Sequence, residues 1–180
     1  MKTFDQMVEL FEAANEAFLK EDKDLIFSGI NERTLCGALM LHLHDEIQAD
    51  TSFQGYYTDV EDNRNRGKSK TIAGPRSIRI NCDLILHSRG RHPEQDNLIA
   101  IEMKKSTRPR KEKQSDRERL AALTSDSLDD YCSFDGENDL QHVCRYVLGV
   151  YYEINIRRNV ATIEYYHESQ MVKQYVCPIK

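Results

Sequence analysis

Two stretches of alternating apolar and polar residues constrain the fold of this chain more than any other feature. The first is IRINCDLILH at 78–87, and the second is NLIAIEMK at 97–104. Because successive side chains of a β-strand point to opposite faces, each stretch predicts a strand with one core face and one mostly polar face. The segment between them, SRGRHPEQD, is rich in turn-forming residues. The two strands therefore predict a β-hairpin with a long loop.

The polar faces of the two predicted strands suggest how they pair. We expect the core faces to be formed by the apolar residues of each alternation, which are Ile80, Cys82, Leu84, Leu86, Ile99, Ile101 and Met103. A register that brings the polar faces together sets Asp83 opposite Glu102, and His87 opposite Leu98. Lys104 then shares the face of Glu102.

The remaining patterns predict an α/β (α+β) fold with a central mixed β-sheet flanked by helices. Apolar residues recur every three to four positions at 3–20 and again at 31–48. We expect a third helix to start at Ser115 or Asp116, either of which can serve as its N-cap. Strand-like composition marks 55–62, 143–154, 160–166 and 171–177, and the nearly continuous apolar run at 143–154 predicts a central strand covered on both faces.

Length, hydropathy and cysteine content place the chain in a broad class. At 180 residues we expect a single domain over 1–180. Since no apolar run reaches the roughly 20 residues that span a bilayer, and the N-terminal segment is acidic and helix-patterned, we expect no membrane association and a cytoplasmic location. The five scattered cysteines contain no Cys-x-x-Cys pair, which favours reduced structural thiols over disulfides or a zinc site.

The charge of the chain is unevenly distributed. Its net charge is −5, yet residues 64–119 hold 16 basic against 7 acidic residues. A basic region within an acidic protein favours a polyanionic partner bound at one place. The alternative is a solvated, loop-rich surface with no partner.

Two carboxylates facing each other on neighbouring strands repel unless a positive charge lies between them. Asp83 and Glu102 are in this arrangement, and hard oxygen ligands without a Cys/His cluster favour Mg²⁺ or Mn²⁺. Lys104 can stabilise negative charge that develops at phosphorus or lower the pKa of an attacking water. The set suits hydrolysis of a phosphodiester by a metal-activated water.

Asp83 followed by Glu102-Met103-Lys104 at the end of an apolar strand resembles the D…ExK signature of the PD-(D/E)XK nuclease superfamily. The resemblance spans roughly 29–166 and implies the restriction-endonuclease-like fold, with core order αβββαβ. It implies metal binding by Asp83, Glu102 and the Met103 carbonyl, and activation of water by Lys104. Many members add a glutamate from the first core helix, a position matched here by Glu32. Cys82 replaces the proline of the motif name.

A metal-dependent nuclease acting on nucleic acid, with DNA favoured over RNA, is therefore the leading hypothesis. We expect the basic residues after the motif to follow a phosphate backbone, namely Lys105, Arg108, Arg110 and Lys111. The resemblance also makes a homodimer possible. Two alternatives stay open: a catalytically silent nucleic-acid-binding or protein-interaction module on the same fold, and a structural protein with an ion-paired sheet face.

Three further assignments concern residues near this site. Glu61 can approach it from the end of the first strand. His87 is expected to be an ordinary hydrogen-bonded histidine. We expect the paired tyrosines at 151–152 and 165–166 to pack in the sheet, in preference to stacking on bases.

Overall fold

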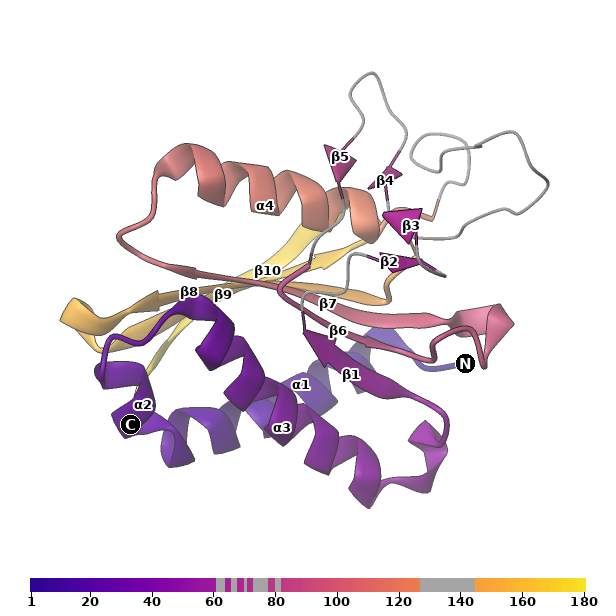
Figure 1. The fold of residues 1–180 in the computed structure, drawn as a ribbon, viewed down its shortest axis with the longest axis horizontal. Coiled ribbons are helices and arrows are strands. Elements are labelled where there is room, and N and C mark those ends of the chain that lie inside the picture. The colour runs from indigo at the N-terminus through magenta and orange to yellow at the C-terminus, as the bar shows by residue number, and fades with distance from the viewer. Residues whose placement is uncertain (61–63, 66–67, 70, 73–77, 80–81, 127–144) are drawn as a thin grey trace.

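A six-stranded mixed β-sheet runs through the centre of the molecule, with helices on both faces (Figure 1). The computed structural model describes residues 1–60, 64–65, 68–69, 71–72, 78–79, 82–126 and 145–180. The strands lie in the order β1 (Tyr57–Val60), β6 (Leu84–His87), β7 (Asn97–Lys105), β8 (Leu148–Asn155), β9 (Val160–His167) and β10 (Gln170–Pro178). β7 and β8 are parallel, and all other neighbours in this sheet are antiparallel. The predicted mixed sheet is confirmed.

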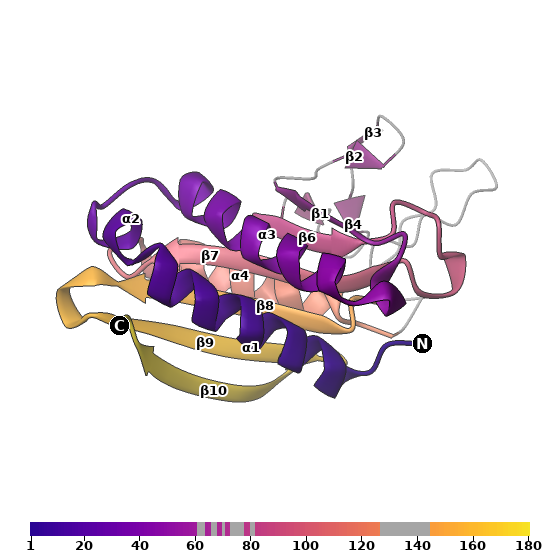
Figure 2. The same ribbon diagram turned by 90° about the horizontal axis from the view of Figure 1, so that it is seen from below.

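The helices divide between the two faces of the sheet. α1 (Phe4–Glu21), α2 (Lys23–Phe27) and α3 (Glu32–Ala49) lie on one face, and α4 (Arg110–Leu123) crosses the other (Figures 1 and 2). Two short ribbons lie between β1 and β6 in the chain, formed by β2 (Arg64–Asn65) with β3 (Lys68–Ser69) and by β4 (Thr71–Ile72) with β5 (Ile78–Arg79). Within the described residues, no helix combines the length and apolar character needed to cross a membrane.

Local capping explains where the long helices begin. Thr3 and Gln6 form a reciprocal capping box at the start of α1, and the Asn31 side chain accepts the N–H of Thr34 at the start of α3. The predicted start of the third helix at Ser115 or Asp116 is wrong. α4 begins at Arg110, directly after Pro109, because the intervening charged residues are good helix formers. Asp116 lies inside the helix and is buried.

The hairpin register is largely as predicted. Leu84 pairs with Ile101, and Leu86 pairs with Ile99. His87 pairs with Asn97 and not with the predicted Leu98, because a bulge shifts the register at that end of the hairpin. Asp83 precedes β6, and its pairing with Glu102 is replaced by a side-chain contact with β7 that is described below. Residues 80 and 81 lie outside the described residues.

The two faces of β7 enter two different cores. Ile99, Ile101 and Met103 are fully buried in the cluster under α1 and α3, as predicted. The opposite face was expected to be mostly polar, but α4 covers it and buries Ala100 and Glu102 completely.

Cys82 is a further correction to the predicted faces. It packs in the cluster on the α4 side with Ile85, and not with Leu84 and Leu86. The strict alternation does not extend back to Cys82, because the chain bends at Asp83 before β6 begins.

The cysteine side chains that the structure describes pack against apolar neighbours. Cys36 and Cys82 are buried and Cys177 is half-buried, which agrees with the predicted structural role. Burial, followed by the negative charges of Asp83 and Glu102, raises the pKa of the Cys36 thiol. This thiol on α3 is therefore unreactive. Two other predicted thiols, Cys132 and Cys144, lie outside the described residues.

Truncation of Ile101 to alanine tests whether the apolar face of β7 anchors the strand. Ile101 is 0% exposed, so Ile101→Ala should lower the free energy of unfolding by about 2–5 kcal/mol in urea denaturation. Leu41→Ala on α3 is the matched control, since Leu41 is 59% exposed and its loss should change stability by less than about 0.5 kcal/mol. Equal effects of the two substitutions would contradict an anchoring role.

Candidate functional site

The carboxyl end of β7 brings together the residues of the predicted motif. β7 is hydrogen-bonded to β6 on one side and to β8 on the other, which fixes the direction of its side chains. Glu102 and Lys104 point towards α4, while Met103 points into the core under α1 and α3. The site is thus built on a central strand.

Asp83 is tied directly to the motif. Its Oδ2 atom accepts the backbone N–H of Met103 at 2.9 Å and lies 3.3 Å from Lys104 Nζ. The Asp83 side chain is 26% exposed, which makes it the most accessible carboxylate of the cluster. The predicted proximity of Asp83 to residues 102–104 is therefore present, although it depends on a side-chain contact with β7.

Lys104 lies among carboxylates. Its Nζ atom is 3.2 Å from Asp116 Oδ2 and 3.3 Å from both Asp83 Oδ2 and the Met103 carbonyl oxygen. Burial favours the neutral amine, but the charges of Asp83, Asp116 and Glu102 outweigh it and raise the pKa of Lys104. The neighbouring carboxylates therefore favour the protonated, positively charged form of the side chain.

Glu102 is completely removed from solvent. Its Oε1 atom accepts a hydrogen bond from Arg119 Nη1 on α4, while Oε2 is buried without a hydrogen-bond partner in the described structure. Burial raises the pKa of Glu102 well above its usual value, and the charges of Asp83 and Asp116 act in the same direction. Arg119 and Lys104 oppose this shift. The second oxygen is a strong acceptor with no donor.

Asp116 and Arg119 belong to the same cluster, although neither is among the site residues predicted from the sequence. Arg119 Nη2 lies 3.3 Å from Asp116 Oδ1, so α4 contributes one acidic and one basic side chain to the cluster. Burial raises the pKa of Asp116 despite the opposing charges of Lys104 and Arg119. Their i, i+3 spacing was a usable signal, because it places both side chains on one helix face. That signal was lost when the helix was predicted to begin at residue 115 or 116.

Glu32, the predicted auxiliary acid, lies at the start of α3 beside the end of β7. Its carboxylate accepts the backbone N–H of Lys105 at 3.0 Å and pairs with the Arg108 guanidinium at 2.8–3.2 Å. Burial raises the pKa of Glu32, but these hydrogen bonds and the Arg108 charge outweigh it, so the pKa is lowered. Within the described part of the chain, the hydrogen bonds and ion pair of Glu32 are with Lys105 and Arg108, and not with Asp83 or Glu102. Its observed role is to fasten β7 to α3.

The predicted phosphate-binding residues fall into two groups. Lys105 Nζ bonds the Gly29 carbonyl at 2.7 Å and Arg108 pairs with Glu32, so both hold the end of β7 to the start of α3. Arg110 and Lys111 are exposed in the first turn of α4. These last two side chains are therefore accessible from solvent.

Other predicted residues near the hairpin have structural surroundings. His87 is 7% exposed and its Nε2 atom lies 2.8 Å from Asp59 Oδ2, which confirms an ordinary hydrogen-bonded histidine. Tyr151 and Tyr165 are fully buried, as expected for packing in the sheet. Glu61 lies outside the described residues.

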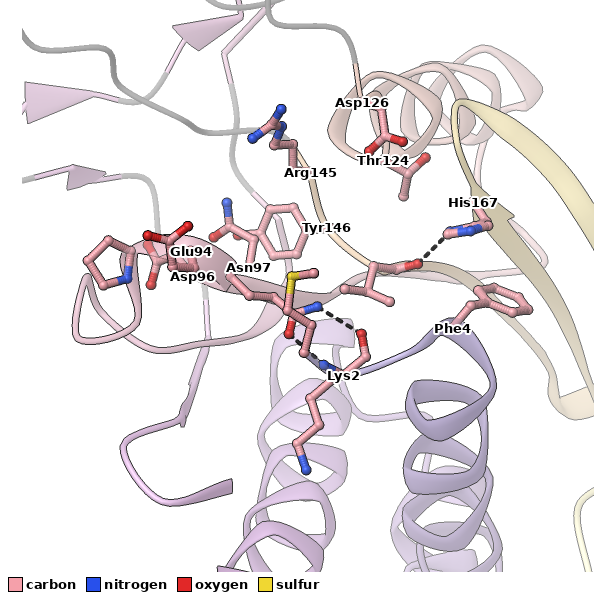
Figure 3. Close-up of a pocket in the computed structure, with 14 residues that line it drawn as sticks. Lys2, Phe4, Glu94, Asp96, Asn97, Thr124, Asp126, Arg145, Tyr146 and His167 are labelled. Carbon is pink, nitrogen blue, oxygen red and sulfur yellow. Dashed lines mark hydrogen bonds between the residues drawn. The ribbon is translucent and has the colours of Figure 1, made fainter. Parts of the chain in front are cut away.

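A separate cavity of about 480 Å³ lies beside the amino-terminal ends of β7 and β8 (Figure 3). Its rim is crossed by reciprocal hydrogen bonds between the Lys2 backbone and the Gln95 side chain, of 2.6 and 2.8 Å. The lining mixes acidic and basic side chains, including Glu94, Asp96, Asp126, Arg145 and His167. Since Lys104 lies at the other end of β7, this cavity is distinct from the carboxylate cluster.

Comparisons with known proteins and a search for metal-ligand clusters add no assignment. No protein-family model, curated protein or solved structure matches the chain. Over the described ranges, no group of three or more histidine, cysteine, aspartate or glutamate side chains is arranged to hold a metal ion. The geometry around Asp83, Glu102 and Lys104 is therefore the main indication of function.

The pH dependence of stability tests the structural role of Glu32. Because the pKa of Glu32 is lowered on folding, its ionised form stabilises the fold above about pH 4.5, and this contribution is lost as pH falls through the folded-state pKa. Glu32→Gln should therefore cost about 1 kcal/mol at pH 7 and progressively less below pH 4.5. Asp45→Asn, at an exposed position of α3, is the control and should leave stability unchanged throughout. A Glu32→Gln deficit that persists unchanged at pH 3 would contradict this role.

Proposed function

We propose that the protein is a divalent-metal-dependent nuclease that hydrolyses phosphodiester bonds, with DNA as the favoured substrate. The observation that carries the proposal is the contact of Asp83 with the backbone of Met103, between Glu102 and Lys104. Asp83 thereby meets the Glu102-Met103-Lys104 segment, which begins 19 positions later, at the end of one buried strand. A sheet face that needed only ion pairs for packing would not require this convergence.

The order of elements supports the restriction-endonuclease-like fold. Apart from the two small ribbons, the chain runs α3, β1, β6, β7, α4, β8, which corresponds to the expected core αβββαβ. The pairing of β7 with β8 in parallel, across α4, is the expected consequence of a helical crossover. We infer this fold from the agreement of element order, strand direction and motif position.

The donor set fits Mg²⁺ or Mn²⁺. Asp83, Glu102 and the Met103 carbonyl would supply hard oxygen ligands, and the unpartnered Glu102 Oε2 is the strongest sign that a positive charge belongs there. When bound, the ion would activate a water and neutralise charge on the phosphate. Repulsion between Asp83 and Glu102 contributes to the raised pKa of Glu102. A divalent ion bound between the two carboxylates would remove this repulsion.

Lys104 supplies the remaining charge. Asp83 and Asp116 hold its ammonium beside the two proposed ligands, at 3.3 and 3.2 Å. A protonated amine fixed in this place can donate hydrogen bonds to a phosphate and stabilise the negative charge that grows during hydrolysis. Its raised pKa keeps it charged, so we assign it to charge stabilisation and to orientation of water.

Cleavage assays test the catalytic proposal. Purified protein incubated with duplex DNA, single-stranded DNA or RNA should cut at least one of them with Mg²⁺ or Mn²⁺ and none with chelator. Asp83→Ala and Lys104→Ala should each lower the rate about 100-fold or more, because the first removes a proposed metal ligand and the second removes the positive charge that would stabilise the reacting phosphate.

Lys20→Ala is the matched lysine control, since Lys20 is exposed on α1 across the sheet from α4. It should cut like the wild type. Cleavage by wild type and Lys104→Ala at equal rates would refute the catalytic role. Binding of nucleic acid without any cleavage would favour the silent module.

Salt dependence tests the proposed phosphate contacts of α4. The double substitution Arg110→Ala/Lys111→Ala should weaken DNA binding in chelator and reduce the slope of log K against log salt by about 1–2, since each phosphate contact contributes about 0.9. Lys20→Ala/Lys23→Ala removes the same charge from exposed positions near α2. An equal change of slope in both double variants would show that net charge matters and that the first turn of α4 does not.

A further inference from the structure

Arg119 contacts Glu102, the carboxylate that is proposed to bind the metal ion. Arg119 reaches from the last two turns of α4 to Glu102 Oε1, and its second terminal nitrogen lies 3.3 Å from Asp116 Oδ1. The guanidinium therefore bridges one acid from β7 and one from α4. Glu102 itself has no exposure to solvent, so a cation cannot reach its carboxylate while this arrangement is intact.

The charges of the cluster indicate what must change. Three carboxylates, those of Asp83, Glu102 and Asp116, surround two cationic side chains, those of Lys104 and Arg119. Glu102 Oε2 lacks a donor even with Arg119 in place, judging from the part of the chain that the structure describes. Arg119 thus pairs with only one oxygen of the Glu102 carboxylate, whereas a divalent ion could bind both oxygens.

Asp116 can keep the Arg119 guanidinium paired if Arg119 leaves Glu102. It already accepts Arg119 on Oδ1 and lies beside Lys104 on Oδ2, both from within α4. A small change in the Arg119 side chain can release Glu102 while the contact with Asp116 persists.

We propose that Arg119 is a resident counter-cation, which holds Glu102 in the absence of metal and is displaced towards Asp116 when a divalent ion binds. The inference rests on the proposed function, because it concerns the same ion. It makes Arg119 a residue that opposes metal binding and supports the metal-free fold. A purely structural ion pair would have no such dual effect.

Substitution of Arg119 by glutamine separates these two effects. Arg119→Gln should bind Mn²⁺ about tenfold more tightly than the wild type by isothermal calorimetry, since the ion no longer competes with a charge-assisted hydrogen bond. Without metal the variant should have a lower melting temperature, because the buried Glu102 carboxyl loses its charged hydrogen-bond donor. Saturating Mn²⁺ should restore most of that loss.

Arg117→Gln is the matched control. Arg117 is on the same helix and makes two 2.8 Å hydrogen bonds to Glu164, which is also buried. Breaking this pair should lower the melting temperature as well, but Mn²⁺ should not restore it and the affinity for Mn²⁺ should equal that of the wild type. Equal recovery of both variants would overturn the proposal.

Two further variants complete the experiment. Arg119→Lys keeps the charge but loses the two-pronged contact, so it should fold and bind Mn²⁺ with an affinity between those of wild type and Arg119→Gln. Arg119→Gln/Glu102→Gln removes both charges, and its stability should not respond to Mn²⁺. Arg119→Lys with wild-type affinity would overturn the proposal even if Arg119→Gln does not fold.

The outcomes distinguish this inference from the proposed function. If the wild type binds Mn²⁺ and the Arg119 variants bind it equally well, the inference fails and the proposed nuclease site stands. If neither the wild type nor any Arg119 variant binds Mn²⁺, both fail. Binding by an Arg119 variant alone would support the inference.

Discussion

The burial of one carboxylate, that of Glu102, is the constraint on which the rest of the site depends. An ionised group at the centre of a sheet covered on both faces is costly unless it is paired. Arg119 provides the pairing from α4, and Asp116 connects Arg119 to Lys104. The same ion pairs therefore hold α4 against the sheet and fix the positions of Glu102 and Lys104. Such a cluster adds little net stability, since hydrophobic residues of similar size could replace it.

The packing of the apolar face of β7 fixes the positions of Glu102 and Lys104 on the opposite face. Ile99, Ile101 and Met103 are locked in the core under α1 and α3, and strands on both sides fix the backbone. Side chains on the opposite face inherit this rigidity, which is the condition for a site that must hold its groups in a defined geometry. Glu32 extends the effect to the last residue of the strand by accepting the N–H of Lys105.

Strand alternation and helix periodicity were sufficient to predict much of the fold. They located the hairpin, its register between Leu84 and Leu86, and both long helices on the α1 face. They could not predict the bulge at His87 or the bend at Asp83, because neither leaves a mark in the spacing of apolar residues. The register error at Leu98 and the misplaced Cys82 both follow from extending a regular alternation beyond the regular part of a strand.

The site was predicted in part for a related reason. Local pattern placed Asp83 near residues 102–104, and the structure adds the Asp83 contact with the Met103 N–H. Asp116 and Arg119 were missed because their partners lie on another element, and a charged helix face reads as solvent-exposed until its packing is known. Glu32 was placed at the correct helix start, but its pairing with Arg108 depends on a loop conformation that the sequence does not reveal.

The most direct test of the account is to locate Mn²⁺ by anomalous diffraction in crystals of the protein soaked with the ion. The account predicts a single strong anomalous peak within about 2.5 Å of oxygens from both Asp83 and Glu102, with Arg119 turned away from Glu102. A peak elsewhere, or an unchanged contact between Arg119 and Glu102 at saturating Mn²⁺, would contradict the central claim that these carboxylates form a metal site.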